Sequence, residues 1–253
     1  MDANIDLFVC THKDFGSKLT NPAYTIVCGD VDIPAEVRVE HIKEDISNVG
    51  FSEWQKFYHI WKHMEVKDYV GLMHYRRVLR LSSDINVIPP AEELLKDFDI
   101  IVGEVIRTPI YQQYQMCHNI KDLEDVIDII RTDYPEYVEG MNKAFSSGKF
   151  IICNTAFMRK EDFYDLCEFM FGVLFKFCER NGIDYTKDES FFNYIDADIE
   201  HYKKYHRPDD YTFREQARVC AYLSERIFNI WAWKRGFKVG SVPYVDGGTA
   251  SVH

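Results

Sequence analysis

The chain has 253 residues, with 41 acidic and 30 basic side chains and a formal net charge of −11 at pH 7. This charge argues against a nucleic-acid partner, because phosphate backbones are bound by basic surfaces. The seven cysteines form no CxxC pair and no metal-ligand spacing, which indicates reduced thiols in a cytoplasmic protein. We expect no signal peptide and no membrane span, because no run approaches the roughly 18 consecutive apolar residues that a span needs.

Short apolar runs alternate with helical patterns along the chain, which predicts an α/β fold with a mostly parallel sheet flanked by helices and a helical C-terminal part. The predicted strands are 5–10, 24–28, 69–73, 99–103, 150–153 and a short one within 236–243. The predicted helices are 52–63, 91–97, 122–133, 161–179 and 213–234, the last as one helix or two joined ones. Residues 31–50 have the composition of a loop, and residues 184–212 show no clear pattern. We expect Ser52 to cap the helix that follows it.

The stretch Asp68–Arg77 has the most informative local pattern in the chain. A buried strand ends abruptly in His74, Tyr75, Arg76 and Arg77, and a ligand site in an open α/β sheet has this layout. The two arginines could neutralise a phosphate or diphosphate, because guanidinium groups match phosphate oxygens and keep their charge. Alternatively, they lie on an exposed loop and pair with surface carboxylates.

Several stretches together resemble a known family: Tyr69–Arg77, Tyr111–Tyr114 with His118 and Asp122, Tyr134–Tyr137, Asn154–Met158 and Leu223–Asn229. The chain resembles GT-A glycosyltransferases. More narrowly, it resembles a family of bacterial glycosyltransferases from capsular and exopolysaccharide clusters, long catalogued as a domain of unknown function. The His-Tyr-Arg-Arg element is the most distinctive of these stretches, and the resemblance extends from about residue 5 to about residue 245.

The resemblance implies a single inverting glycosyltransferase domain over residues 1–253, in which 1–105 bind the nucleotide sugar and 106–253 bind the acceptor and catalyse. The implied donor is a UDP-linked hexose such as galactose or galactofuranose, and the implied acceptor is a surface polysaccharide or a lipid-linked glycan. The alternatives are a non-catalytic nucleotide-sugar or glycan-binding protein on a degenerate GT-A fold, and a nucleotidyl- or phosphate-transferring enzyme. The basic and aromatic run 202–207 would allow at most peripheral contact with the inner face of the membrane.

GT-A enzymes hold a divalent metal on the diphosphate with an Asp-x-Asp motif, and His74-Tyr75-Arg76-Arg77 stands in that place here. We therefore expect no cofactor, with Arg76 and Arg77 as diphosphate ligands; a manganese ion is the alternative. The Asp-x-Asp at 196–198 is interpreted as a solvated helix end. By the same resemblance, the remaining donor-side candidates are Thr11, His12, Lys13 and Glu104, and Asn48 and His253 are further candidates. An ordinary polar loop is the competing interpretation of 11–13.

On the acceptor side, aromatic rings stack on sugars and amide groups bind hydroxyls. The candidates are Tyr111, Gln113, Tyr114, His118, Asn154 and Arg226, although the two tyrosines could be core residues. By the same resemblance, Glu225 matches the position of the catalytic base of inverting GT-A enzymes. Ser224 stands where many of those enzymes have a first acidic residue. A structural Glu225–Arg226 ion pair is the alternative. Asp122 is a second catalytic candidate that could instead cap its helix.

Overall fold

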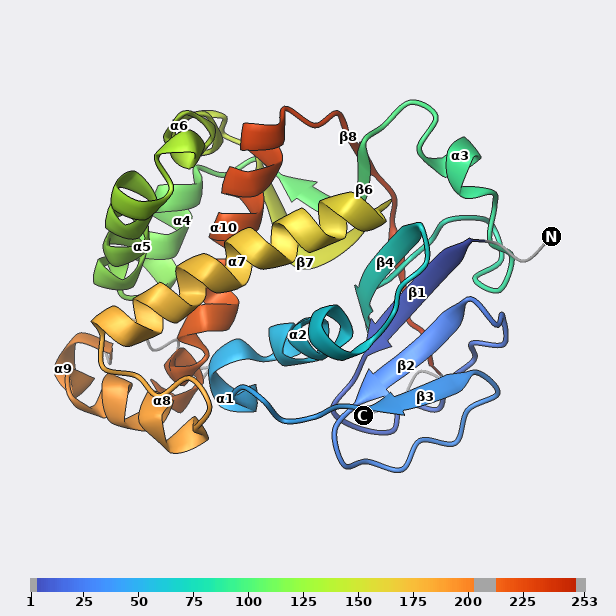
Figure 1. Ribbon diagram of the computed structural model, residues 1–253, viewed down its shortest axis with the longest axis horizontal. Helices are drawn as coiled ribbons and strands as arrows, with labels where there is room; N and C mark the ends of the chain where they lie inside the picture. Colours follow the sequence, from blue (N-terminus) through green and yellow to red (C-terminus); the bar gives the residue numbers. More distant parts are fainter. Residues whose placement is uncertain (1–3, 203–212, 249–253) are drawn as a thin grey trace.

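The computed structural model describes residues 4–202 and 213–248 (Figure 1). Seven strands of these residues form one mixed sheet in the order β3-β2-β1-β4-β7-β6-β8. Their bounds are β1 Ile5–Cys10, β2 Tyr24–Cys28, β3 Arg38–His41, β4 Tyr69–His74, β6 Ile100–Ile106, β7 Phe150–Arg159 and β8 Val239–Ser241. Strands β5, Val78–Leu79, and β9, Tyr244–Val245, form a separate antiparallel pair. The strands of both predicted halves of the chain therefore belong to one sheet.

Strand direction confirms a mostly parallel sheet. Strand β1 runs parallel to β2 and β4, β2 is parallel to β3, and β6 is parallel to β8. Strand β7 is antiparallel to both of its neighbours, β4 and β6. In the β1–β4 register, Cys10 lies opposite His74, so the ends of these two strands meet at one edge of the sheet.

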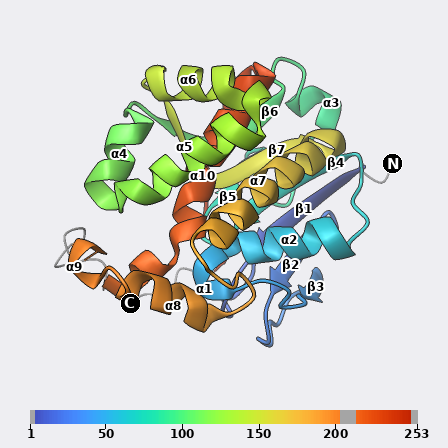
Figure 2. The ribbon, with the colours of Figure 1, turned by 60° about the vertical axis from the view of Figure 1, so that its left-hand side comes forward.

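The central strands are buried on both faces, because their side chains alternate between two cores. Phe8 and Cys10 of β1 belong to the larger core, whereas Leu7 and Val9 belong to the smaller one. Helices α2, Glu53–His63, α7, Lys160–Arg180, and α10, Val219–Arg235, contribute buried side chains to the larger core. In Figures 1 and 2, α2 and α7 lie side by side across this face of the sheet. The smaller core is closed by loops and by the short helix α3, Ala91–Leu94.

Several of the remaining helices pack along α10, as far as Lys234 in its last turn. Helices α5, Ile120–Asp133, and α6, Val138–Ser146, contact α10, and α4, Ile110–Cys117, contacts both of them. The 3-10 turn η1, Pro135–Tyr137, joins α5 to α6, and η3, Phe213–Ala217, precedes α10. Helix α8, Asp188–Asp196, contacts η3 and α1, Asn48–Phe51, and is followed by α9, Ile199–Tyr202. These contacts confirm the predicted helical C-terminal part.

The structure confirms the predicted strands and helices, except that α3 ends at Leu94 rather than at residue 97 and β7 continues beyond Cys153 to Arg159. It also assigns elements to the segments that had no clear pattern. Residues 31–50 are not all loop, because they contain β3 and the start of α1. Strand β3 has the sequence Arg-Val-Glu-His and lies at an edge, so burial does not impose an apolar alternation on it. Residues 107–120 contain α4, and 184–202 contain α8 and α9. The predicted helix 213–234 is two joined ones, η3 and α10.

Neither Ser52 nor Asp122 makes a side-chain helix cap, although Ser52 occupies the N-cap position of α2. Ser52 precedes α2, but it has φ 54° and its side chain makes no capping hydrogen bond. Its Oγ instead accepts a hydrogen bond of 2.9 Å from Arg218 Nη2. The cap of α5 is Asn119, whose side chain accepts from Lys121 N, so Asp122 lies inside the first turn.

Candidate functional site

A pocket of about 720 Å³ lies where the carboxyl ends of β1 and β4 meet. The chain leaves β1 toward β2 on one side and returns as β4 on the other, and ligands of open α/β sheets bind at such switch points. The lining residues come from seven regions: Cys10, Thr11 and His12; Asn48, Val49, Ser52, Glu53 and Lys56; His74, Arg76 and Arg77; Gln113, Cys117 and His118; Cys153; Phe192; and Arg214, Glu215, Gln216, Arg218, Ala221, Tyr222, Glu225 and Arg226. Both predicted halves of the chain therefore line one pocket.

The pocket is electropositive within an acidic chain. Six of its lining side chains are cationic and three are carboxylates: Lys56, Arg76, Arg77, Arg214, Arg218 and Arg226 against Glu53, Glu215 and Glu225. The whole chain carries −11. This local excess of positive charge suits an anionic ligand, because a cleft lined by one sign of charge concentrates the opposite sign.

The end of β4 folds into a tight turn that presents the two arginines. Arg77 N donates to His74 O at 2.7 Å, and Arg76 N donates to His74 Nδ1 at 3.3 Å. Burial, together with Arg76 and Arg77, lowers the pKa of His74 to about 3. His74 is therefore a neutral ring that accepts at Nδ1, which leaves Nε2–H as a donor toward a ligand.

Tyr75 and Lys13 support the site without lining it. Tyr75 is only 4% exposed and packs against the rings of His12, His74 and Phe15. Lys13 Nζ lies 5.9 Å from the centre of the Tyr75 ring. Burial and the neighbouring cations, Lys13 first among them, lower the pKa of His12. Of the three residues predicted to bind the donor at 11–13, Thr11 and His12 line the pocket and Lys13 does not.

The sequence interpretation missed three further cations of the pocket. Arg218 donates to Ser52 Oγ and lies 5.7 Å from the Tyr222 ring, and Arg214 lies 5.0 Å from the Phe192 ring. Lys56 is 5% exposed and donates to Asn48 Oδ1 at 2.6 Å, while burial lowers its pKa. Lys56 is hidden in the apolar pattern of α2. For Arg214 and Arg218, the only signal in the sequence was that two basic residues stand just before α10.

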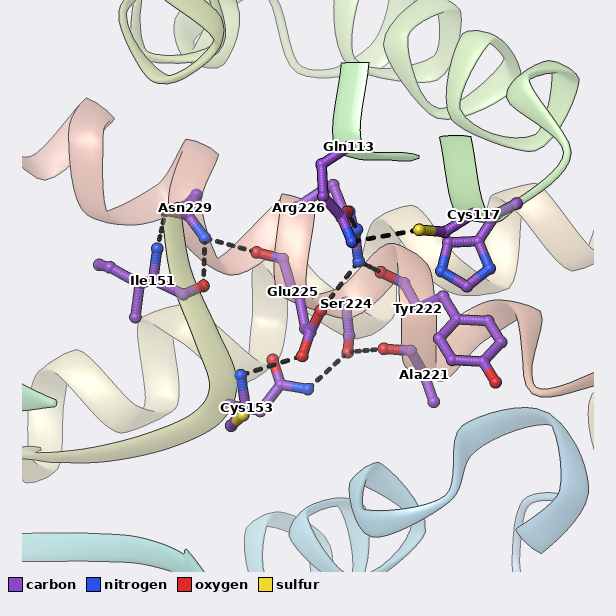
Figure 3. Close-up of polar contacts among 12 residues, drawn as sticks. Gln113, Cys117, Ile151, Cys153, Ala221, Tyr222, Ser224, Glu225, Arg226 and Asn229 are labelled. Carbon is purple, nitrogen blue, oxygen red and sulfur yellow. Dashed lines mark hydrogen bonds and ion pairs between the residues drawn. The ribbon is translucent and has the colours of Figure 1, made fainter. Parts of the chain in front are cut away.

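Glu225 is held between β7 and its neighbour in α10 (Figure 3). Its Oε1 accepts from Cys153 N at 2.9 Å, and its Oε2 accepts from Arg226 Nη1 at 2.9 Å. Cys153 and Asn154 have φ angles of 72° and 48°, so the strand is irregular where it meets Glu225. Burial raises the pKa of Glu225, and Arg226 opposes that rise. The result is a carboxylate with fixed orientation and increased basicity at the pocket wall.

Arg226 has the contacts of a structural residue. Its side chain is 1% exposed and donates to Tyr222 O at 2.8 Å and to Gln113 Oε1. Its guanidinium lies 4.8 Å from the centres of the Tyr114 and Phe150 rings. Burial lowers its pKa, and Glu225 counteracts that shift. The predicted Glu225–Arg226 pair therefore exists, and it also orients the carboxylate that lines the pocket.

A second carboxylate, Glu53, enters the pocket from α2. Asn154 Nδ2 donates to Glu53 Oε1 at 3.2 Å and to Ser224 Oγ at 3.0 Å. Ser224 in turn donates to Ala221 O at 2.6 Å. Asn154 is 3% exposed and lies behind the lining residues, where it positions Glu53. Sequence reasoning did not single out Glu53, because it stands in the first turn of a helix, where acids are common.

The predicted acceptor-side residues divide into two groups. Gln113 and His118 line the pocket, and His118 Nδ1 lies 3.0 Å from Gln216 Oε1. Tyr114 is a buried core residue, and Tyr111 packs partly buried with its hydroxyl donating to Glu124 at 3.0 Å. The interpretation of both tyrosines as packing residues agrees with these positions.

Asp122 and Glu104 lie outside the pocket lining. Asp122 is 1% exposed and accepts from the hydroxyls of Tyr194 at 2.7 Å and Tyr202 at 3.1 Å. Burial raises the pKa of Asp122 to about 7. Glu104 is exposed on β6. In this structure Asp122 joins α5 to α8 and α9.

The Asp-x-Asp at 196–198 is a solvated helix end, as predicted: α8 ends at Asp196, and Asp198 lies 3.4 Å from Lys121. Residues 4–202 and 213–248 contain no cluster of three or more His, Cys, Asp or Glu that could hold a metal. In the same residues no helix combines the length and apolarity needed to cross a membrane. His253 and most of the run 202–207 lie outside the described residues.

Comparison with known proteins adds a family and a fold. The family model described as a domain of unknown function, DUF4422, matches residues 6–195. Among solved structures, the apo structure of the bifunctional glycosyltransferase WbbM is similar, with a TM-score of 0.69 and 20% identity over 97% of this chain. This chain covers only 45% of that structure. No curated protein matches. The likeness confirms the predicted α/β, glycosyltransferase-like fold.

Proposed function

The chain belongs to the DUF4422 family, and from its fold and its pocket we propose that it is a glycosyltransferase that uses a nucleotide diphosphate sugar. The observation that carries the proposal is the pairing, in one pocket at the β1–β4 switch point, of an arginine cluster with the carboxylate of Glu225. The arginines suit a diphosphate, and the carboxylate suits an acceptor hydroxyl. The structural neighbour is itself a glycosyltransferase, which supports the same class of reaction.

On the donor side, Arg76 and Arg77 bind the diphosphate, and Arg218 approaches from the start of α10. Arg218 lines the same pocket as Arg76 and Arg77, and its guanidinium is held by Ser52 Oγ. The neutral His74 donates from Nε2, and Thr11 and His12 lie where the nucleoside would enter. These residues supply positive charge for the leaving diphosphate, which gains charge as the bond to the sugar breaks.

On the acceptor side, Glu225 accepts the proton of the acceptor hydroxyl while the hydroxyl oxygen attacks the anomeric carbon. The bond from that carbon to the diphosphate oxygen breaks, and the nucleoside diphosphate leaves. A direct attack of this kind inverts the anomeric configuration. Glu225 can act in this way because Cys153 N and Arg226 fix its two oxygens and burial strengthens it as a base.

The finer substrate assignment rests on the sequence resemblance. We propose a UDP-linked hexose, galactose or galactofuranose, as donor, and a surface polysaccharide or lipid-linked glycan as acceptor. The reaction takes place in the cytoplasm, with at most peripheral contact with the membrane, and without a metal cofactor. Residues 1–105 contribute most of the donor side, and residues 106–253 contribute Glu225 and the acceptor side.

A thermal-shift screen with nucleotide sugars tests the donor, because a ligand that binds only the native state raises its melting temperature. The expected result is stabilisation by a UDP-hexose and by UDP, followed by UDP release when a glycan acceptor is added. Stabilisation without any release across an acceptor panel would instead favour a nucleotide-sugar-binding protein. The full pairing of Glu225 with Arg226 is the observation that favours this second candidate.

A further inference from the structure

A second cavity of about 380 Å³ lies between α10, β8 and the adjoining ends of β6 and β7, apart from the pocket described above. Its lining residues are Val105, Arg107, Lys149, Ile151, Asn229, Ala232, Trp233, Phe237 and Val239. None of them is shared with the first pocket. Nothing in the proposed donor site or in Glu225 accounts for this cavity.

Strand pairing explains how its polar and apolar parts are arranged. Strands β6 and β7 are antiparallel, with Val105 opposite Ile151 and Ile106 opposite Phe150. One residue beyond this ladder, Arg107 follows β6 and Lys149 precedes β7, so they form the next opposed positions. Side chains two apart along a strand share a face, which places the two cations beside the pair Val105–Ile151. All four line the cavity.

The two cations lack a carboxylate partner in the cavity. Arg107 and Lys149 are both exposed, and none of the residues that line the cavity is acidic. Among the ion pairs found within 4–202 and 213–248, neither residue takes part. Like charges opposite one another across two strands are destabilising, and an anion between them removes that cost. The arrangement therefore suits an anionic group.

The rest of the cavity is apolar. Val105 is 37% exposed although it is a large apolar residue, and Trp233 and Phe237 are only half-buried. The polar atoms of Asn229 are already used, because its Nδ2 donates to Ile151 O at 2.8 Å and to Glu225 O at 2.7 Å, and its Oδ1 accepts from Ile151 N at 2.9 Å. Figure 3 shows these bonds joining Asn229 to β7. No polar group of Asn229 is left for a ligand, so this floor suits a hydrocarbon chain.

We infer that this cavity binds an amphiphile with a phosphate head group, that is, a lipid phosphate. The phosphate lies between Arg107 and Lys149, and the first part of the apolar chain lies against Val105, Trp233 and Phe237. Arginine and lysine both bind phosphate strongly, and the apolar floor distinguishes a lipid phosphate from free phosphate.

The position of the cavity indicates where the proposed glycosyltransferase holds its acceptor. This point alone depends on the proposed function. Asn229 is one turn of α10 beyond Glu225, about 6 Å along the helix axis. A glycan attached to the bound phosphate would extend along β7 from Lys149 toward Cys153, whose N–H holds Glu225, a span of four residues or about 13 Å. The cavity would thus anchor the lipid-linked acceptor beside the base.

Calorimetry with the full chain tests the inference, with octyl phosphate, octyl glucoside and inorganic phosphate, each below any micelle concentration. The expected result is saturable binding of octyl phosphate at one site, accompanied by a change in tryptophan fluorescence that is lost in Trp233→Phe. The double variant Arg107→Gln/Lys149→Gln should bind it about tenfold more weakly or worse, because two charge-assisted contacts are removed. The matched control Lys18→Gln/Lys96→Gln removes the same charge from exposed positions outside the cavity and should bind normally.

Three results would overturn the inference: no binding of octyl phosphate, equal binding by the double variant, or equal affinity for octyl glucoside or inorganic phosphate. Binding of UDP is measured in the same samples and should be unchanged in the double variant, because the two cavities share no residue. Octyl phosphate binding without UDP binding would contradict the proposed donor site and leave the lipid-phosphate site standing. The experiment therefore distinguishes a failure of the lipid-phosphate site from a failure of the proposed donor site.

Discussion

Glu53 and Glu225 are held by consecutive residues of β7, although they stand far apart in the sequence. The side-chain amide of Asn154 donates to Glu53 at 3.2 Å, and the backbone N–H of Cys153 donates to Glu225 at 2.9 Å. Each carboxylate lines the pocket, one from α2 and one from α10. The negative charge of Glu53 contributes to the raised pKa of Glu225, after the larger effect of burial. A short irregular segment of one strand thus fixes two acids in one site.

The first prediction concerns Glu225 as the base. Glu225→Gln keeps the shape of the side chain and removes the proton acceptor, so turnover should fall by about two to four powers of ten. Donor affinity should be nearly unchanged, because the arginines that bind the diphosphate are intact. Turnover and nucleotide affinity are measured together, and circular dichroism checks the fold. Full turnover in this variant would show that Glu225 is not the base.

The second prediction concerns the influence of Glu53 on that base. Glu225 must be ionised to accept a proton, so activity should rise with pH through its raised pKa. Glu53→Gln removes a neighbouring negative charge, which lowers the pKa of Glu225. The acidic limb of the kcat/KM profile should therefore move to lower pH. An unchanged limb would mean that Glu53 does not act on the group that titrates, and Glu44→Gln, a carboxylate outside the pocket lining, is the control.

The elements of the central sheet could be predicted because burial imposes a pattern on their sequence. Strands β1, β2 and β4 are mainly apolar runs followed by polar residues, because the side chains that enter the two cores must be apolar. Strand β3 was missed because it is an edge strand with partly exposed residues. The same distinction holds in the pocket. Arg76 and Arg77 follow a strand and stand out, whereas Lys56 and Glu53 occupy ordinary helical positions and are brought to the site only by tertiary packing.

The third prediction concerns donor binding. Arg76→Ala or Arg77→Ala should weaken nucleotide-sugar affinity by roughly 1.5–3 kcal/mol for each charged hydrogen bond lost. Both side chains are exposed at the pocket, so the fold should not depend on them. Arg80→Ala is the matched control, since Arg80 is an exposed arginine of the same segment outside the lining. If calorimetry gives the wild-type affinity for both pocket variants, the assignment of the diphosphate to this turn is wrong.

The fourth prediction concerns metal. A leaving diphosphate needs positive charge, supplied either by a divalent ion or by fixed cationic side chains. Arg76, Arg77 and Arg218 line the pocket and are permanently charged. The enzyme should therefore keep most of its activity in excess chelator, and added manganese or magnesium should change it little. Loss of activity in chelator with recovery in manganese would show that the arginines do not replace an ion.

The fifth prediction concerns Asp122 as a group that couples stability to pH. Burial raises its pKa from 3.8 to about 7 in the folded chain, despite hydrogen bonds from Tyr194 and Tyr202. Between these values the unfolded chain loses a proton that the folded chain retains. Ionisation therefore favours unfolding as pH rises, and each unit of pKa difference corresponds to about 1.4 kcal/mol. The contribution of Asp122 to stability should be greatest below pH 3.8 and should decline up to about pH 7.

Asp122→Asn removes this titration while its amide oxygen can still accept a tyrosine hydroxyl. The free energy of unfolding of the variant, measured by denaturant titration, should depend less on pH between about 4 and 7 than that of the wild type. Glu225 and Asp162 also have raised pKa values, so the test compares the two slopes rather than their absolute values. Tyr194→Phe, which keeps the carboxyl and removes one hydroxyl, should retain the steep slope. Parallel slopes for wild type and Asp122→Asn would mean that Asp122 is already ionised throughout this range, and that its tyrosine partners stabilise the charge against burial.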